Sequence, residues 1–270
     1  MSVLLEVKNF STGYQHKIVQ DIHFKLHSGE MIAILGPNGC GKSTLLKGLM
    51  GTLTSEGEVF VDNQNFLKMS VKEKAKHMTL FMQRYEAIEG ISALEMIKMG
   101  QYAYSSFFQF QTDMSLIQSL SKEFHIEDLL DKDFMSLSEG QKQLVGIVRV
   151  LYQKTKVILL DEPDSALDFD NRHMLYHHLL KKVKQQGLGI VVVMHDPMIA
   201  LQYADRILLM DQLTIIDTID MKKESVENIE KKLKKLYKDI MIKKDDIYKQ
   251  YYSLVKICEP KEREGINVND

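Results

Sequence analysis

A glycine-rich stretch between an apolar run and a helical pattern constrains the fold of this chain more than any other feature. Met31 to Leu35 is continuously apolar, which is typical of a strand buried on both faces. Ser43 to Met50 has a helical pattern, and Gly51 after it is a natural C-cap. The residues in between are Gly36, Pro37, Asn38, Gly39, Cys40, Gly41, Lys42, Ser43 and Thr44. A strand that turns through glycines directly into a helix predicts an α/β unit.

Further buried strands alternate with helices along the chain. The segments Val157 to Leu160, Ile190 to Met194 and Arg206 to Met210 are likewise nearly continuous in apolar residues. Asn171 to Gln186 places apolar residues on one helical stripe and ends at Gly187. This alternation predicts an α/β fold with a mixed, mostly parallel core sheet.

Two regions depart from the alternation. Val3 to Val7 and Glu58 to Asp62 resemble short strands flanked by turn residues, so we expect an antiparallel β part near the N-terminus. Strand signals largely vanish from about residue 84 to 153, which predicts a helical subdomain inserted into the core. Its expected helices are Ala93 to Met99, Met114 to Phe124 and Gln141 to Leu151.

The last fifty residues form a separate, Lys-rich segment. We expect the main domain to cover residues 1–218 and a C-terminal helical extension to cover residues 219–270. Four residues of the extension predict an amphipathic helix with one apolar stripe: Ile229, Leu233, Leu236 and Ile240. The final residues are expected to be disordered.

Charge and composition exclude several classes of protein. The formal net charge of the 270 residues is −2, so nothing indicates binding to nucleic acid. The two cysteines, Cys40 and Cys258, offer no disulfide framework or zinc spacing, which indicates a reducing compartment. The start of the chain does not resemble a secretory signal, and no apolar run approaches the roughly 20 residues needed to cross a bilayer. We therefore expect a cytoplasmic protein that reaches a membrane only through a partner.

The nine residues from Gly36 to Thr44 fit the phosphate-binding pattern G-x-x-x-x-G-K-[ST]. Glycines allow backbone N–H groups to turn inward around phosphate oxygens, and the following helix adds the positive end of its dipole. Lys42 is then expected to reach the β- and γ-phosphates, and the Ser43 hydroxyl to ligate Mg²⁺. The alternative is a glycine-rich turn without a ligand.

Two acidic residues, Asp161 and Glu162, follow the apolar strand that ends at Leu160. Charges at the end of a buried strand are costly unless they have a purpose, and ligands bind at this end of α/β sheets. Asp161 is suited to the metal ion, and Glu162 to orienting a water for in-line attack on the γ-phosphate. The alternative is a solvated strand end.

Further motifs resemble those of the ABC-type ATPases, and they occur in that family's order. Leu137-Ser138-Glu139-Gly140-Gln141 is similar to the family's LSGGQ signature, and Ser165-Ala166-Leu167-Asp168 is similar to its D-loop. Tyr14 stands where an aromatic ring would stack on adenine. Gln83 follows the strand-like run Thr79 to Met82, as the Q-loop glutamine does, and His195 resembles the switch histidine. The resemblance covers residues 2 to 217.

The resemblance implies a P-loop ATPase that works as a homodimer. In the family, two ATP molecules lie between two subunits, and the signature of one subunit covers the γ-phosphate bound by the other. Ser138, Gly140 and Gln141 are expected in that role, with the D-loop residue Asp168 beside the nucleotide. His195 would contact the γ-phosphate, and Gln83 would sense Mg²⁺ and the attacking water.

Some assigned residues have simpler alternatives, and some depart from the family pattern. Gln83 alone would be an ordinary surface residue, His195 could cap a turn, and Tyr14 could pack in a loop. Glu139 stands in place of a glycine, and its charge would weaken nucleotide binding unless it points away. Asp164 replaces the usual threonine, and Val148-Arg149-Val150 replaces Ala-Arg-Ala. None of these changes removes a catalytic group.

Two segments resemble the importers of iron–siderophores, haem and cobalamin: Met99-Gly100-Gln101-Tyr102 and the stretch from Ser165 to Arg172. The resemblance implies a membrane permease docked near residues 84–110, and indirectly a substrate-binding protein. Gln101 departs from that group's arginine. The alternatives are the ATPase subunit of an exporter or of another importer, a soluble ABC ATPase, and a nucleotide-binding regulator without turnover.

Overall fold

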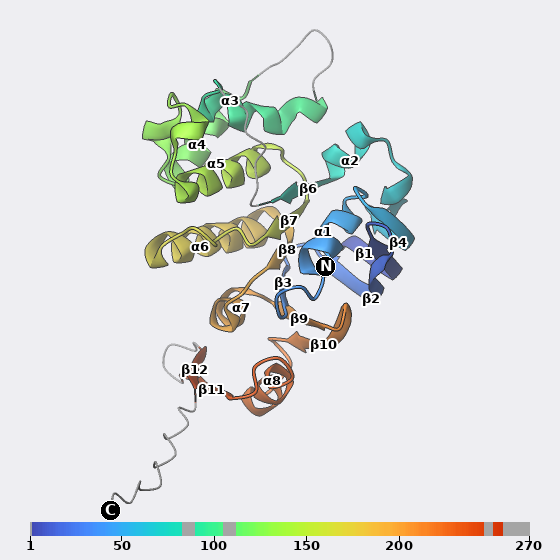
Figure 1. The fold of residues 1–270 in the computed structure, drawn as a ribbon. Helices are drawn as coiled ribbons and strands as arrows, with labels where there is room; N and C mark the ends of the chain where they lie inside the picture. The colour runs from blue at the N-terminus through green and yellow to red at the C-terminus, as the bar shows by residue number, and fades with distance from the viewer. Residues whose placement is uncertain (1, 83–89, 105–111, 246–250, 256–270) are drawn as a thin grey trace, which may run out of the picture.

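The computed structural model describes residues 2–82, 90–104, 112–245 and 251–255 (Figure 1). Its strands and α-helices follow one another in the order β1 (Val3–Gly13), β2 (Lys17–His27), β3 (Met31–Leu35), α1 (Lys42–Leu49), β4 (Thr54–Val61), β5 (Gln64–Asn65), α2 (Val71–His77), β6 (Met78–Phe81), α3 (Ala93–Lys98), α4 (Met114–Glu123), α5 (Glu139–Tyr152), β7 (Val157–Asp161), α6 (Phe169–Gln186), β8 (Gly189–Val193), α7 (Pro197–Tyr203), β9 (Arg206–Asp211), β10 (Thr214–Asp220), α8 (Val226–Leu233), β11 (Ile240–Lys244) and β12 (Tyr251–Val255).

A six-stranded sheet with the order β10-β9-β3-β8-β7-β6 forms the centre of the molecule. The five strands from β9 to β6 are parallel, and only β10 pairs antiparallel, with β9. The predicted mixed, mostly parallel sheet is therefore confirmed. All four predicted buried strands are present, within one residue at each end.

Helices and a second sheet cover the two faces of this central sheet. Along β3, Met31, Ala33 and Leu35 join the core formed with α3 to α7, whereas Ile32 and Ile34 join the core formed with α1 and the N-terminal sheet. Alternate side chains of a strand point to opposite faces, so a strand covered on both faces must be continuously apolar. This explains the pattern in the sequence.

The N-terminal part is a four-stranded antiparallel sheet with the order β2-β1-β4-β5. The two short strands predicted there are correct in position, but β1 is longer than expected and β2 was not predicted. β2 alternates buried Ile22, Phe24 and Leu26 with polar residues, because only one of its faces packs on the core.

The helical subdomain contains the three predicted helices, α3, α4 and α5, beside the β6 edge of the central sheet (Figure 1). Each begins at a side-chain cap: Ser92, Asp113 and Ser138 accept hydrogen bonds from backbone N–H groups of the first turn. Helix α5 begins two residues before the predicted start, because Ser138 and Gln141 form a capping box.

The predicted helix from Ile229 to Ile240 is wrong beyond its first half. Helix α8 ends at Leu233, and Ile240 begins β11, which pairs with β12 in a hairpin. Ile229, Leu233 and Ile240 are nevertheless all buried in the same core. The turn after α8 brings the later residues back to that core, so the apolar spacing resembled a longer helix.

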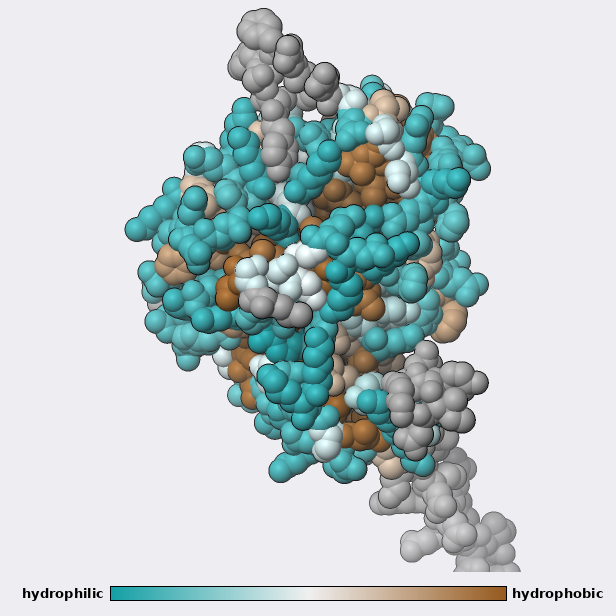
Figure 2. Space-filling view, turned by 180° about the vertical axis from the view of Figure 1, so that it is seen from behind, coloured by the Kyte–Doolittle hydropathy of each residue, from teal (hydrophilic) through white to brown (hydrophobic). Residues whose placement is uncertain are grey.

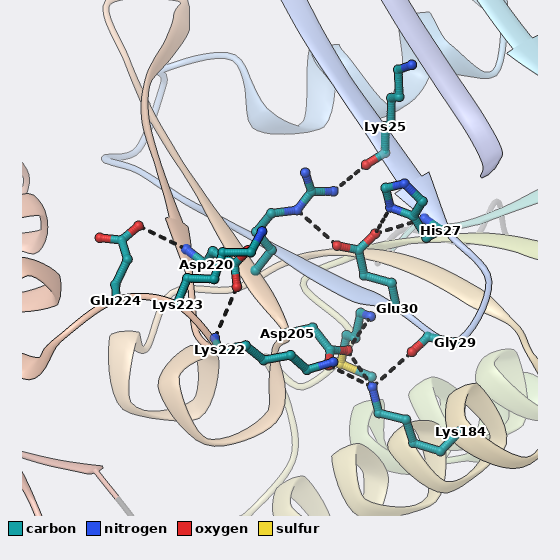
Figure 3. Close-up of polar contacts among 12 residues, drawn as sticks. Lys25, His27, Gly29, Glu30, Lys184, Asp205, Asp220, Lys222, Lys223 and Glu224 are labelled. Atoms are coloured by element: carbon teal, nitrogen blue, oxygen red, sulfur yellow. Dashed lines mark hydrogen bonds and ion pairs between the residues drawn. The ribbon is translucent and has the colours of Figure 1, made fainter. Parts of the chain in front are cut away.

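Charged residues at the amino-terminal ends of β3 and β9 join several elements (Figure 3). Asp205 accepts hydrogen bonds from the Met31 backbone N–H at 3.0 Å and from Lys184 Nζ of α6 at 2.7 Å. Arg206 Nε lies 2.9 Å from Glu30 Oε1, and Arg206 Nη2 donates to the Lys25 carbonyl oxygen. This network lies at the end of the sheet opposite to the glycine-rich loop.

Candidate active site

The loop from Gly36 to Thr44 joins β3 to α1 and depends on its glycines. A Cβ on Gly36 would lie 2.2 Å from the Met210 carbonyl oxygen, so β9 approaches too closely for any side chain. Gly41 has a φ of 98° and is the N-cap of α1. Because Gly41 has no side chain to accept the first-turn N–H groups, those groups suit an anion.

Lys42 lies inside this loop. Its side chain is buried, and Nζ donates to the carbonyl oxygens of Gly36 at 2.8 Å and Pro37 at 3.0 Å. Phosphate oxygens could replace these acceptors with little movement of the ammonium group. Pro37, Asn38 and Gly39 form the exposed tip of the loop.

Cys40 is buried under the loop, and burial raises the pKa of its thiol. The neutral thiol acts as a small packing group. Thr44 follows Ser43 in the first turn of α1 and is half-buried.

The hydroxyl of Ser43 donates a hydrogen bond of 2.9 Å to Asp161 Oδ1 at the end of β7. The fold thus brings together the oxygen atoms of Ser43 and Asp161, which are 118 positions apart in the sequence, as a pair that could bind a metal ion. Burial raises the pKa of Asp161 above its usual value, with the hydrogen bond from Ser43 acting in the opposite direction. A desolvated carboxylate beside a hydroxyl fits Mg²⁺, which prefers oxygen ligands and takes only one or two carboxylates.

Glu162 and His195 meet at the ends of the adjacent parallel strands β7 and β8. His195 Nε2 lies 2.6 Å from Glu162 Oε1. Glu162 has a φ of 50°, a left-handed conformation that costs a non-glycine residue about 1–2 kcal/mol. Such strain persists where the surrounding structure enforces it and is common at active sites.

Tyr14 lies between β1 and β2 and contacts α1, the helix that follows the loop. Its side chain is 55% exposed, and its hydroxyl accepts a hydrogen bond of 3.3 Å from Lys47 Nζ. An exposed aromatic ring held at its rim is suited to stacking. Gln83, the predicted Q-loop glutamine, lies outside the described residues.

The signature and D-loop residues lie at the starts of two other helices. Ser138 caps α5 by accepting from the Gln141 N–H at 3.3 Å, and Asp168 caps α6 by accepting from the Asn171 N–H at 2.9 Å. Both Ser138 and Asp168 are exposed. Gly140 is required here because a Cβ would lie 2.9 Å from the Ala166 carbonyl oxygen of the D-loop.

The unusual Glu139 is 75% exposed and pairs with Lys142, whose Nζ lies 2.9 Å from Glu139 Oε1. The neighbouring ammonium group offsets the carboxylate, so the expected repulsion of a nucleotide is reduced. The unusual Asp164 is paired as well, since its Oδ2 lies 3.1 Å from Arg172 Nε.

Three residues near the site were missed from the sequence: Lys47, Gln143 and Arg172. Lys47 stands four residues after Ser43 in the same helical pattern, so its position on the same helix face could have been found. Gln143 and Arg172 bind the D-loop through tertiary contacts, for which the sequence carries no comparable local signal.

The comparisons with known proteins agree with this geometry. Residues 19–165 match the family model described as ABC transporter. The petrobactin import ATP-binding protein FpuD of Bacillus anthracis is 33% identical over 77% of this chain and 77% of its own length. The hemin import ATP-binding protein HmuV of Vibrio parahaemolyticus is 34% identical over 77% and 82%. The phosphonates import ATP-binding protein PhnC 2 of Oceanobacillus iheyensis is 33% identical over 76% and 85%.

Solved structures share most of this fold. A metal-chelate type ABC transporter in an inward-facing conformation has a TM-score of 0.76 and 26% identity, and the match covers 94% of this chain and 96% of that chain. The dimeric ABC transporter cassette MJ0796 has a TM-score of 0.73 and 25% identity, over 81% and 99%. The matched family model covers more than half of the 270 residues, and the chain therefore belongs to the ABC transporter family, as an ATP-binding and ATP-hydrolysing subunit.

Proposed function

We propose that two copies of this chain hydrolyse Mg²⁺-bound ATP at shared sites and drive a permease that imports metal chelates of the iron–siderophore, haem or cobalamin type. The observation that carries the catalytic part is the pairing of Ser43 with Asp161 and of Glu162 with His195. Both pairs lie at the carboxyl ends of parallel strands, where α/β sheets bind ligands.

Each residue of these pairs has a distinct role in the proposed reaction. Lys42 and the N–H groups at the start of α1 bind the β- and γ-phosphates. Ser43 and Asp161, with Gln83, would hold Mg²⁺, which neutralises charge on the phosphate oxygens.

Glu162 accepts a hydrogen bond from the attacking water and takes its proton as the bond to the γ-phosphorus forms and the bond to ADP breaks. His195 holds the Glu162 carboxylate through the 2.6 Å contact, and we assign to it a contact with the γ-phosphate as well.

Dimerisation supplies the rest of the proposed site. Ser138 and Asp168 are exposed, and their hydrogen bonds are confined to the first turns of α5 and α6. In the part of the chain that the structure describes, no hydrogen bond joins them to the loop that holds Lys42. We therefore assign Ser138, Gly140, Gln141 and Asp168 to the nucleotide held by the second copy.

The permease contact is assigned to the helical subdomain. Met99 and Tyr102 are exposed at 43% and 74%, whereas Met96 in the preceding helix is buried in the core. Figure 2 shows a hydrophobic patch over the helical subdomain, in the upper right of the view. Exposed apolar groups of this kind mark interaction surfaces. None of the helices in the described residues has the length and apolarity of a membrane span. Because relatives are named import ATP-binding proteins, we place the chain on the inner face of the membrane, bound to the permease.

The class of cargo rests on similarity. Two of the relatives are named for import of hemin and petrobactin, and the similar transporter structure is of the metal-chelate type. The phosphonate importer among the relatives supports a second candidate, an importer of small anions.

Purification from detergent-solubilised membranes tests this assignment. A polytopic permease should co-purify with the tagged chain, and Tyr102→Asp should reduce its recovery. Met114→Asp, on another exposed large side chain of the same subdomain, should not. Recovery of soluble proteins alone would count against a transport role. Uptake of an iron chelate or of a phosphonate by cells with and without the chain separates the two cargo classes.

A further inference from the structure

The loop from Pro163 to Asp168, between the catalytic strand β7 and helix α6, is held from two sides by polar side chains. On the side of α6, Asp164 Oδ2 lies 3.1 Å from Arg172 Nε. The side chain of Asp164 is 15% exposed and that of Arg172 is 31% exposed, so the pair is largely removed from water. Burial of an ion without its partner is costly, and this loop conformation therefore requires both partners.

Burial makes the Asp164 carboxylate depend on this contact. Tyr176, one turn beyond Arg172 in α6, is fully buried, so α6 turns an apolar face toward the core at this point. Burial raises the pKa of Asp164, and the positive charge of Arg172 acts in the opposite direction. Arg172 therefore favours the charged form of Asp164.

On the other side, a single amide of α5 binds two groups of the loop. Gln143 is 3% exposed. Its Nε2 donates to Ser165 Oγ at 2.6 Å, and its Oε1 accepts from the Ala166 N–H at 3.1 Å. Gly140, one turn earlier, allows the Ala166 carbonyl to approach α5 closely. Both ends of the Gln143 amide therefore define the position of the loop.

The anchored residues, Asp164 to Ala166, lie between two residues whose placement matters for the reaction. Glu162, two residues before Asp164, has the left-handed φ of 50° and contacts His195. Asp168, at the other end of the loop, caps α6 and faces solvent. Helix α5, which supplies Gln143, begins at the signature residue Ser138.

We propose that Asp164, Arg172 and Gln143 are positioning residues that fix the D-loop between α5 and α6, so that Glu162 and the signature helix move as one rigid unit. This inference rests on the proposed function, because it assigns no new chemistry and acts through Glu162 and Ser138.

A double-mutant cycle tests the pair. Asp164→Asn and Arg172→Gln should each lower kcat for ATP about tenfold, with KM changed less than about twofold, because a misplaced Glu162 affects the transition state more than ATP binding. Since both variants break one contact, the double variant should be no slower than the slower single variant. Gln143→Leu, which keeps the volume and removes both hydrogen bonds, should lower kcat by a similar factor.

Asp170→Asn serves as the matched control, because Asp170 is an exposed carboxylate in the first turn of the same helix. Rates are expressed per folded protein, measured from urea unfolding curves. Unchanged kcat in the single variants, or losses that multiply in the double variant, would overturn the inference even if Glu162→Gln is inactive. An active Glu162→Gln protein would instead overturn the proposed function.

Discussion

At the scale of single residues, the contact between Glu162 and His195 leads to a direct test of the chemistry. Glu162→Gln keeps the shape of the side chain and removes its ability to accept a proton. Hydrolysis should fall by about 10²- to 10³-fold, while ATP still binds. Phosphate release and a nucleotide-binding titration measure the two effects.

Glu58→Gln is the matched control for this variant, because Glu58 is an exposed carboxylate on β4. ATP should also hold the Glu162→Gln protein as a dimer in size-exclusion chromatography, since the nucleotide between the subunits is no longer consumed. Phosphate release at the original rate would rule out Glu162 as the proton acceptor.

The buried carboxylate of Asp161 is expected to lower the stability of the protein at neutral pH, although ATP hydrolysis requires it. Burial raises the pKa of Asp161 in the folded state above the unfolded value of 3.8. Ionisation of this carboxyl therefore costs stability above its folded pKa, and the cost disappears as the pH falls below the unfolded value. Asp161→Asn should raise the melting temperature of the nucleotide-free protein at pH 7 but abolish ATP hydrolysis.

Thermal unfolding between pH 3.5 and pH 7 measures this effect. The gain from Asp161→Asn should shrink toward the acidic end of the range. A gain that is constant with pH, or a loss at pH 7, would contradict the assignment of a desolvated carboxylate.

The site residues that could be predicted are those that belong to a short sequence pattern with a known chemical role. The loop from Gly36 to Ser43 needs glycines, a lysine and a hydroxyl at fixed spacing, so the sequence alone locates it. Asp161 and Glu162 are visible because two acids end an apolar strand. The partners of Asp164 and Gln143 could not be predicted, because they depend on how α5 and α6 lie beside the loop.

At the scale of elements, the strands that are buried on both faces were predicted within one residue at each end, whereas in the half-buried N-terminal sheet β1 and β4 were predicted only in part and β2 was not predicted. β3, β7, β8 and β9 are apolar along nearly their whole length, since both of their faces are covered. In β2 a polar face interrupts the pattern. In the C-terminal segment, a turn after Leu233 returns Ile240 to the core, and spacing alone cannot distinguish this path from a continuous helix.

The network around Asp205 connects β3, α6 and β9, and it predicts a large effect on stability. Asp205→Ala leaves the buried Met31 N–H without its acceptor and removes the carboxylate partner of Lys184, whose Nζ keeps its hydrogen bond to the Gly29 carbonyl oxygen. An unsatisfied buried donor costs about 1–3 kcal/mol. Urea unfolding should therefore show a loss of about 2 kcal/mol.

Lys222→Ala is the control in this network. Lys222 Nζ lies 3.5 Å from Asp205, and its side chain is 66% exposed, so its removal should cost less than about 1 kcal/mol. Equal losses in the two variants would show that the backbone contact to Met31 contributes little.

At the scale of the whole molecule, the proposed site is divided between two regions of the chain. The phosphate loop, Asp161 and Glu162 lie at the ends of the central strands, whereas Ser138 begins a helix of the helical subdomain. In a twofold dimer, the phosphate loop of one copy can face the signature helix of the other copy, and the reverse contact is then made as well. One copy can therefore complete the site of the other. Such a division explains why Ser138 is exposed in a single chain.

Complementation between two inactive variants tests this arrangement. Lys42→Ala damages the phosphate loop, and Ser138→Arg damages the signature, so each homodimer should be inactive. In a mixed dimer, one site combines the intact loop of the second variant with the intact signature of the first. Random mixing makes half of the dimers mixed, each with one of two sites restored, so about a quarter of the original activity should return. If Ser138 instead acted on the nucleotide of its own chain, both kinds of site in the mixture would stay damaged, and no activity would return at any ratio.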